Sequence, residues 1–139
     1  MSSTPLLDGR TVIVTGAATG IGQAFSLACS AQGARIVVAD MGPADETMDL
    51  IARAGGQALY VRADVADDAS TQAMAAAALQ RFGRIDGLIN NAAYFREVKL
   101  TDFEDIDPAQ WDRIFAVNVK GVWNCCKAVM PSMRAQGSG

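Results

Sequence analysis

The sequence alternates short runs rich in β-branched residues with longer segments in which apolar residues recur at helical spacing. Four of the runs are predicted to be strands, at residues 11–15, 35–40, 57–62 and 86–90. Their apolar residues are consecutive and not strictly alternating, which is typical of strands buried on both faces. Short strand–helix–strand connections favour parallel strands with right-handed crossovers. The sequence therefore predicts an α/β fold, a Rossmann-type doubly wound parallel sheet.

Glycine and proline mark the ends of the predicted helices. Three sites carry glycine where a helix is expected to end in the left-handed conformation: Gly33, Gly55–Gly56 and Gly83. Pro43 and Pro108 are predicted at first helical positions, and Asp107 with Gln110 resembles a capping box. The first helix is expected to bury the apolar residues that recur at helical spacing: Ile21, Ala24, Phe25, Ala28 and Cys29.

Composition excludes several classes of function. The 139 residues include no histidine, and the three cysteines lack Cys-x-x-Cys spacing, so no metal or haem site is expected. A net charge of −3 with scattered basic residues gives no support for a nucleic-acid or anionic membrane partner. The N-terminus does not resemble a secretory signal, and the longest apolar run, residues 73–79, is too short to span a membrane. We expect a cytoplasmic protein with reduced cysteines.

A glycine-rich turn joins the first predicted strand to the first predicted helix. Glycines let the backbone approach a bound pyrophosphate, and a helix N-terminus offers unpaired N–H groups with partial positive charge. The spacing of this turn departs from the usual G-x-G-x-x-G pattern, and a purely structural turn is the alternative. The candidate cofactor-binding residues here are Gly16, Ala18, Thr19, Gly20, Ile21 and Gly22.

An acidic residue ends the second predicted strand. Asp40 stands 24 residues after Gly16, close to where a carboxylate accepts hydrogen bonds from an adenosine ribose diol. Asp40 would repel a 2′-phosphate, and neither residues 17–19 nor Met41-Gly42 supply a basic side chain for one. These features favour NAD as the cofactor, with Asp40 and Met41 in its site. The alternative is that Asp40 caps a helix starting near Pro43.

Four motifs lie after predicted strands or in the last predicted helix. They are Thr15-Gly16-x-x-x-Gly20-Ile21-Gly22, Asp64-Val65, Asn90-Asn91-Ala92-Ala93 and Asn118-Val119-x-Gly121. Together they resemble the short-chain dehydrogenase/reductase family across essentially the whole chain. The resemblance implies that Asp64 and the backbone of Val65 contact the adenine. It also implies that Asn90, Asn91 and Ala92 lie along the cofactor ribose and support the sheet. Ala93 departs from the family, which more often has glycine there, and turn chemistry is the alternative for Asp64 and for the asparagine pair.

Asn118 is predicted to lie inward on a helix. It shares helical spacing with a set of apolar residues: Trp111, Ile114, Phe115, Val122, Cys125, Val129 and Met133. A buried amide must find partners, so Asn118 either bonds a local helix carbonyl or holds an ordered water. The family resemblance implies the second role, an active-site asparagine that positions a water in the proton relay to a catalytic lysine.

Other catalytic residues of the family have no counterpart in the sequence. The family uses a serine and a Tyr-x-x-x-Lys pair, whereas Tyr60 and Tyr94 are followed four residues later by Asp64 and Val98. The chain therefore looks like the N-terminal dinucleotide-binding portion, residues 1–139, of a longer domain, with strand order 3-2-1-4. We expect it to be inactive by itself, with an open apolar sheet edge that favours association.

The long loop at residues 92–107 is predicted at the carboxyl edge of the sheet, where loops are often functional. Tyr94 lies in it and could act as a substitute acid, although substrate contact or loop packing is the preferred interpretation.

The predicted function is an NAD-dependent oxidoreductase that transfers a hydride between the nicotinamide and the alcohol or carbonyl carbon of a small organic substrate. The alternative is a non-catalytic dinucleotide-binding module or an inactive fragment. By resemblance, the complete protein is expected to be a homo-oligomer.

Overall fold

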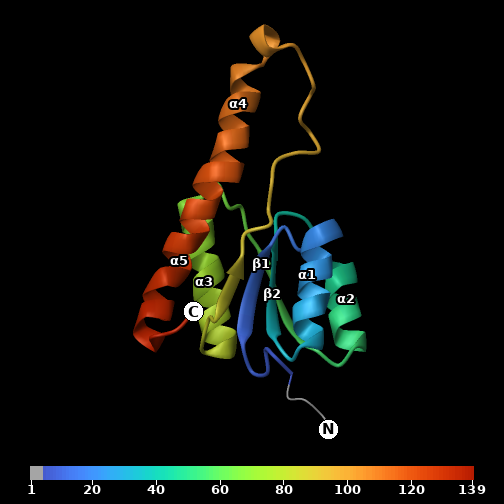
Figure 1. The fold of residues 1–139 in the computed structure, drawn as a ribbon, viewed down its shortest axis with the longest axis vertical. Helices are drawn as coiled ribbons and strands as arrows, with labels where there is room; N and C mark the ends of the chain where they lie inside the picture. The colour runs from blue at the N-terminus through green and yellow to red at the C-terminus, as the bar shows by residue number, and fades with distance from the viewer. Residues whose placement is uncertain (1–4) are drawn as a thin grey trace.

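A computed structural model describes residues 5–139 and contains a four-stranded parallel sheet (Figure 1). The strands are β1 (Thr11–Thr15), β2 (Arg35–Asp40), β3 (Gln57–Arg62) and β4 (Gly87–Ile89). Their order is β3-β2-β1-β4, which confirms the predicted fold class and topology. The centre of the sheet aligns Ile13 of β1 with Val37 of β2 and Leu88 of β4. The predicted bounds of the first three strands are confirmed, whereas β4 is shorter than the predicted 86–90.

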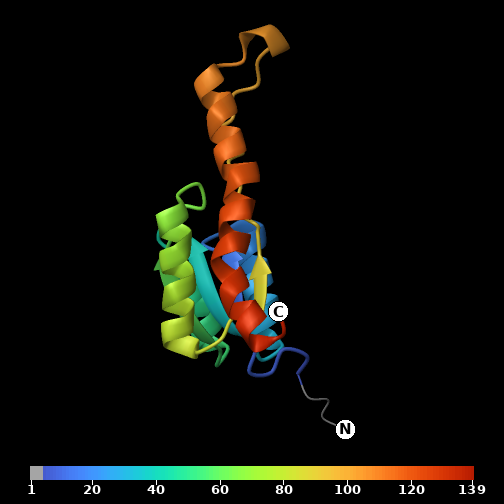
Figure 2. The same cartoon turned by 90° about the vertical axis from the view of Figure 1, so that its left-hand side faces the viewer.

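Helices cover both faces of the sheet (Figures 1 and 2). On one face lie α1 (Gly20–Ala31) and α2 (Asp45–Arg53), and on the other lie α3 (Asp68–Phe82) and α5 (Gly121–Gln136). Successive residues of β1 enter opposite cores: Val12 and Val14 pack under α1 and α2, and Ile13 packs under α3 and α5. Burial on both faces explains why the strand sequences are apolar without alternation. None of the helices described within residues 5–139 is long and apolar enough to cross a membrane.

The buried face of α1 differs from the prediction. Gly22 and Ser26 are its buried residues, whereas Ile21 is 70% exposed and Phe25 is 44% exposed. The reason is the close approach of α1 to the turn before it: a Cβ on Gly22 would lie 2.1 Å from the carbonyl oxygen of Gly16. Small residues therefore occupy the contact, and the larger apolar side chains lie beside it.

Of the two prolines predicted at first helical positions, one occupies such a position and the other does not. Pro108 is the first residue of α4 (Pro108–Phe115), whereas α2 begins at Asp45, so Pro43 precedes its helix. Asp107 caps α4 by accepting a hydrogen bond from the N–H of Ala109. Gln110 does not complete a capping box, because its side chain pairs with the backbone of the preceding loop. Three predicted helix ends do have positive φ, namely Gly33, Gly55 and Gly83.

The loop at 92–107 and α4 project beyond the carboxyl ends of the strands (Figures 1 and 2). The loop contains one short 3₁₀ turn, η1 (Phe103–Asp105), and a π-helix, η2 (Ala116–Lys120), joins α4 to α5. Gln110 of α4 holds the loop by a two-point pairing, accepting from the N–H of Lys99 at 2.9 Å and donating to its carbonyl at 3.2 Å. The long helical segment, which consists of α4, η2 and α5 (residues 108–136), is therefore bonded to the loop through Gln110.

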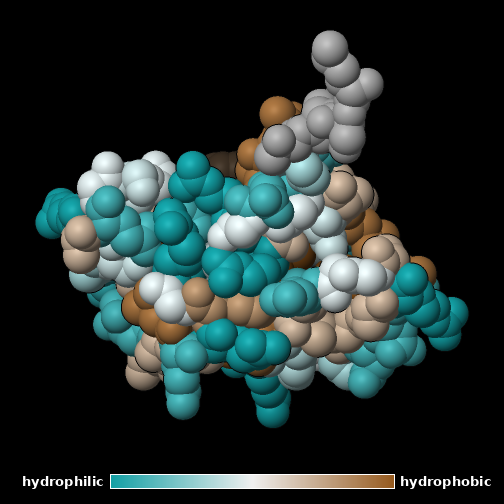
Figure 3. Space-filling model, turned by 90° about the horizontal axis from the view of Figure 1, so that it is seen from below, coloured by the Kyte–Doolittle hydropathy of each residue, from teal (hydrophilic) through white to brown (hydrophobic). Residues whose placement is uncertain are grey.

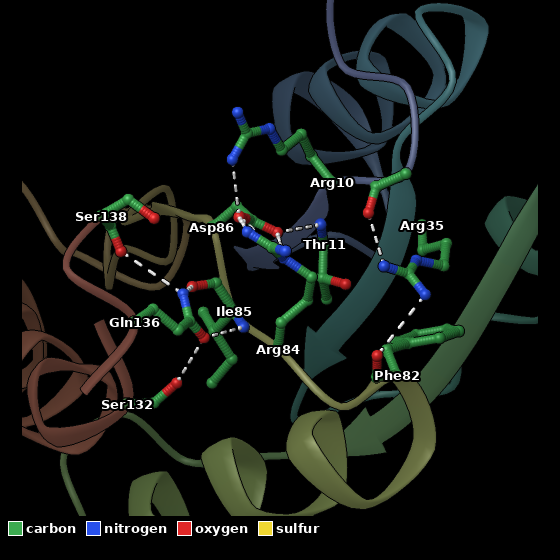
Figure 4. Close-up of polar contacts among 11 residues, drawn as sticks. Arg10, Thr11, Arg35, Phe82, Arg84, Ile85, Asp86, Ser132, Gln136 and Ser138 are labelled. Atoms are coloured by element: carbon green, nitrogen blue, oxygen red, sulfur yellow. Dashed lines mark hydrogen bonds and ion pairs between the residues drawn. The ribbon is translucent and has the colours of Figure 1, made fainter. Parts of the chain in front are cut away.

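A cluster of polar contacts joins the segments at the opposite end of the sheet (Figure 4). The side chain of Asp86 is only 4% exposed and accepts hydrogen bonds from Arg10, Arg84 and the N–H of Thr11. Nearby, Gln136 of α5 makes a two-point pairing with the backbone of Ile85. Seen from below, hydrophilic side chains cover much of this end, with apolar patches between them (Figure 3).

The charge of Asp86 is stabilised by these contacts. Burial alone would raise the pKa of this carboxyl, but the hydrogen bonds from Arg84, Thr11 and Arg10 together lower it from 3.8 to about 2. A group whose pKa is lower in the folded state stabilises the fold above its unfolded pKa and loses that contribution as the pH falls through the folded pKa.

We therefore predict that Asp86→Asn lowers the unfolding free energy by about 2 kcal/mol at pH 7. The difference from the parent chain should shrink as the pH falls from about 4 to about 2, because the parent carboxyl becomes protonated there. Urea unfolding at several pH values measures both effects. Asp68→Asn is the control, because Asp68 is half-exposed in its pair with Lys127 and should matter far less. An equal loss at pH 2 and pH 7 would contradict the prediction.

Candidate functional site

A cleft of about 570 Å³ lies at the carboxyl ends of the strands. It is bordered by segments that follow each strand, which is the edge where open parallel sheets bind ligands. The candidate residues in its lining are Gly16, Thr19, Gly20, Ile21, Asp40, Met41, Asp64, Val65, Asn91 and Ala92. The fold thus brings together residues from four separate stretches of sequence.

The glycine-rich turn is locked against the segment after β4. The hydroxyl oxygen of Thr15 accepts hydrogen bonds from the N–H groups of Asn91 and Ala92, both at 3.1 Å. The amide nitrogen of Asn91 donates in return to the carbonyls of Thr15 and Gly16, also at 3.1 Å. Gly16 has φ +65°, and a Cβ there would lie 2.9 Å from the Cα of Ala92. Glycine is therefore required at this point both by conformation and by space.

The N-terminus of α1 opens on the cleft. Thr19 occupies its N-cap position but makes no capping hydrogen bond with its side chain, and Thr19 and Gly20 are exposed. Arg96 of the long loop extends over this turn, with a guanidinium nitrogen 3.7 Å from the position a Cβ on Gly20 would take. Uncapped N–H groups and a nearby cation suit an anionic ligand. Arg96 was missed by the sequence analysis, because its approach to Gly20 joins residues far apart in the chain.

Asp40 holds the turn to the end of β2. One carboxylate oxygen accepts from the N–H of Ala18 and the other from the N–H of Gly42, both at 2.9 Å. The predicted alternative, that Asp40 caps the next helix, is wrong, because Ala44 is the N-cap of α2. Each carboxylate oxygen has two lone pairs, so Asp40 keeps capacity for further hydrogen bonds from the cleft.

Asp64 forms an Asx turn, the structural role that was the alternative to adenine contact, and it also borders the cleft. Its Oδ1 accepts from the N–H of Ala66 at 2.9 Å, and its Oδ2 lies 3.7 Å from a guanidinium nitrogen of Arg113. The same nitrogen is 3.9 Å from the sulfur of Met41, and the guanidinium lies 5.9 Å from the centre of the Tyr94 ring. Arg113 thus connects α4 to three parts of the cleft.

Several candidate residues lie outside the cleft lining. Ala18 and Gly22 are buried beneath the turn, where Ala18 holds Asp40 and Gly22 packs under Gly16. Asn90 is exposed, and its amide nitrogen is 3.5 Å from the sulfur of Cys126. The lining also includes residues outside the candidate cofactor set, from the strand ends, the long loop and the helix above: Ala39, Ala63, Ala93, Tyr94–Glu97, Arg113 and Val117. Of these, the sequence analysis had considered Tyr94 for substrate contact. Arg113 precedes Val117 by one helical turn, a spacing that could have placed both on one face.

The prediction that Asn118 is buried is wrong. Asn118 is exposed, and its amide makes a two-point pairing with the backbone of Tyr94: Oδ1 accepts at 2.8 Å and Nδ2 donates at 3.2 Å. The predicted face assumed a uniform period of 3.6 residues, but Asn118 lies in the π-helix η2, which has a wider turn. Val117, 7% exposed, faces the core instead.

The buried cysteine of α5, Cys125, is a packing residue of the core. Burial, with a smaller effect of Cys126, raises the pKa of the Cys125 thiol to about 11. Cys125 is therefore a protonated thiol at neutral pH and lacks the thiolate that a nucleophile needs.

Comparisons with known proteins agree with this geometry. The sequence model of the family described as short chain dehydrogenase matches residues 10–139. A sorbitol dehydrogenase of Cereibacter sphaeroides is 40% identical over 133 residues, covering 96% of this chain and 50% of the relative. A D-threitol dehydrogenase of Mycolicibacterium smegmatis is 41% identical over 136 residues, covering 96% and 51%. A crystal structure of levodione reductase has a TM-score of 0.90 at 32% identity, covering 96% of this chain and 52% of that one. The chain spans about half the length of the curated relatives it matches.

Proposed function

Because the chain belongs to the short-chain dehydrogenase family, we propose that it is the cofactor-binding portion of an NAD-dependent oxidoreductase. Residues 1–139 form the N-terminal part of a longer Rossmann domain, a proposal supported by relatives about twice as long. The complete enzyme acts on the alcohol or carbonyl carbon of a small organic substrate. Relatives named dehydrogenases and reductases do not favour a non-catalytic module.

The observation that carries this proposal is the glycine-rich turn locked between Asn91 and Asp40. Bare glycines at 16 and 20 let a pyrophosphate approach the backbone, and the uncapped start of α1 supplies N–H donors. Arg96 adds a positive charge over the same turn. When bound, the nicotinamide cofactor accepts or donates the hydride. The chain's own residues bind and orient the dinucleotide.

Asp40 supports NAD over NADP. Its carboxylate is fixed at the rim of the cleft by the N–H groups of Ala18 and Gly42, so a 2′-phosphate beside it would meet a fixed negative charge. Arg113, a cation close to neighbouring Met41, is paired with Asp64. This arrangement suits a ribose diol that donates hydrogen bonds to a carboxylate.

We predict that NAD binds at least about tenfold more tightly than NADP, a difference of about 1.4 kcal/mol. Asp40→Asn should reduce the discrimination, because it removes the charge and keeps one acceptor oxygen. Fluorescence titration of the chain with each dinucleotide measures both constants. Asp49→Asn is the matched control, because Asp49 is an exposed carboxylate of α2 outside the cleft lining. Tighter binding of NADP than of NAD would overturn the assignment.

We also propose that Asn118 serves the proton relay of the complete enzyme by positioning a water. Its pairing with Tyr94 uses one N–H and one lone pair of the amide. One N–H and one lone pair remain for an ordered water, and the exposure of Asn118 leaves them accessible. The relay leads to a lysine of the family's Tyr-x-x-x-Lys pair, which residues 1–139 do not contain, so the chain alone binds cofactor without turnover.

In the complete enzyme, Asn118→Leu should lower kcat by about 10²-fold, the scale of a lost proton-transfer path. The substitution also frees the Tyr94 backbone, so Gln110→Leu serves as a control that frees Lys99 further along the same loop. Steady-state nicotinamide absorbance measures turnover, and circular dichroism checks the fold. Undiminished turnover of a folded Asn118→Leu enzyme, or an equal loss in Gln110→Leu, would contradict the relay role.

We further propose a homo-oligomer that uses the long helical segment. Its exposed apolar side chains are Trp111, Phe115, Val119, Val122, Trp123 and Met130. Such a concentration of exposed apolar residues is typical of an interaction surface. Gel filtration should show a species larger than the 14.6 kDa monomer. A monomer with cooperative melting would argue against a homo-oligomer.

The cytoplasmic location stays a prediction.

A further inference from the structure

Asn124 is a buried polar residue of α5 that contacts the turn after β3. It is 0% exposed, and its amide nitrogen donates a hydrogen bond to the carbonyl of Val65 at 2.9 Å. Gly121, one turn earlier, brings the helix close to the same residue, because a Cβ there would lie 2.6 Å from a methyl carbon of Val65. The turn therefore lies directly against α5.

The peptide unit between Val65 and Ala66 is held at both of its polar ends. Asn124 donates to its carbonyl, and its N–H donates to Oδ1 of Asp64 at 2.9 Å. The N–H of Asp64 is itself bonded to the hydroxyl of Ser70. Fixing this peptide fixes the Asx turn, and the Asx turn sets the direction of the Asp64 carboxylate at the cleft.

We propose that Asn124 is a positioning residue for the adenine end of the dinucleotide, acting through the Val65–Ala66 peptide on the carboxylate of Asp64. The inference rests on the proposed function, because it assumes that Asp64 and Val65 meet the adenine. Asn124 does not line the cleft, so it acts through the turn and not by contact with the ligand.

The contribution of Asn124 to the stability of the fold can be separated from its positioning role. The carbonyl oxygen of Asn124 has no hydrogen-bond partner within residues 5–139. A buried acceptor without a partner costs stability, which offsets what the hydrogen bond to Val65 contributes. An apolar side chain of similar size removes this unpartnered oxygen and leaves the Val65 carbonyl without its donor. Because one unpartnered acceptor replaces another, the fold should be supported about as well.

The test compares Asn124→Val, Asp64→Ala and the double variant in the full chain, using NAD as the ligand. Asn124→Val should weaken NAD binding by about tenfold with Tm within about 4 °C of the parent. In the Asp64→Ala background the same substitution should have little further effect, because Asn124 acts through that carboxylate. A merely structural role would instead give additive losses.

Hydrogen exchange of the Ala66 N–H in the ligand-free chain tests the positioning step without any cofactor. Exchange should be faster in Asn124→Val, because the peptide loses one of its two anchors. Val129→Ala is the matched control: Val129 is 2% exposed in the same helix, and its loss should lower Tm while leaving Ala66 exchange and NAD affinity unchanged.

The outcomes distinguish the inference from the proposed function. If the parent chain binds NAD and Asn124→Val binds it equally well, or if the losses add, the positioning role is overturned and the proposed function stands. Unchanged exchange at Ala66 overturns the positioning role as well. If the parent chain binds no NAD under any condition, both the proposed function and the inference fail.

Discussion

The hydrogen bonds between Thr15 and Asn91 are the constraint on which the cleft depends. They join the carboxyl ends of β1 and β4, neighbouring strands whose sequences lie far apart, and they fix the start of the glycine-rich turn. Once the turn is fixed, the packing of Gly22 under Gly16 sets the direction of α1. These contacts therefore hold the N-terminus of α1 to the sheet, and a ligand bound in the cleft would meet donors already in place.

Side-chain amides hold the long helical segment to the rest of the chain. Gln136 pairs with the backbone of Ile85 before β4, and Asn118 pairs with that of Tyr94 after it. Gln110 makes the same kind of pairing farther along the loop. An amide carries a donor and an acceptor side by side, so it can satisfy both polar groups of an irregular backbone. These pairings let the segment from α4 to α5 position a loop that has little secondary structure of its own.

Features that depend on neighbouring residues could be predicted from the sequence, whereas features that depend on contacts between distant segments could not. The first three strands follow from apolar runs that must be buried on both faces, and their parallel direction follows from their short helical connections. The strand order was implied by the family resemblance. The face of α1 could not be predicted from hydrophobicity, because close approach at Gly22 favours small residues over large ones. Asn118 was misplaced by the wider turn of η2, which no spacing rule revealed. Arg113 and Asn124 were missed because their partners, Asp64 and Val65, lie 49 and 59 residues away in the sequence.

The structural and functional interpretations of Asp40 and Asp64 need not compete. From the sequence, each carboxylate had a structural alternative to cofactor contact: a helix cap for Asp40 and a turn for Asp64. The Asx turn at Asp64 is present. Asp40 likewise bonds two backbone N–H groups, yet both residues line the cleft. A carboxylate has about four lone-pair sites, so backbone bonds that fix its direction leave others for a ligand. In the proposed binding site, the turn contacts orient both carboxylates before a ligand arrives, and that orientation would reduce the entropy lost on binding.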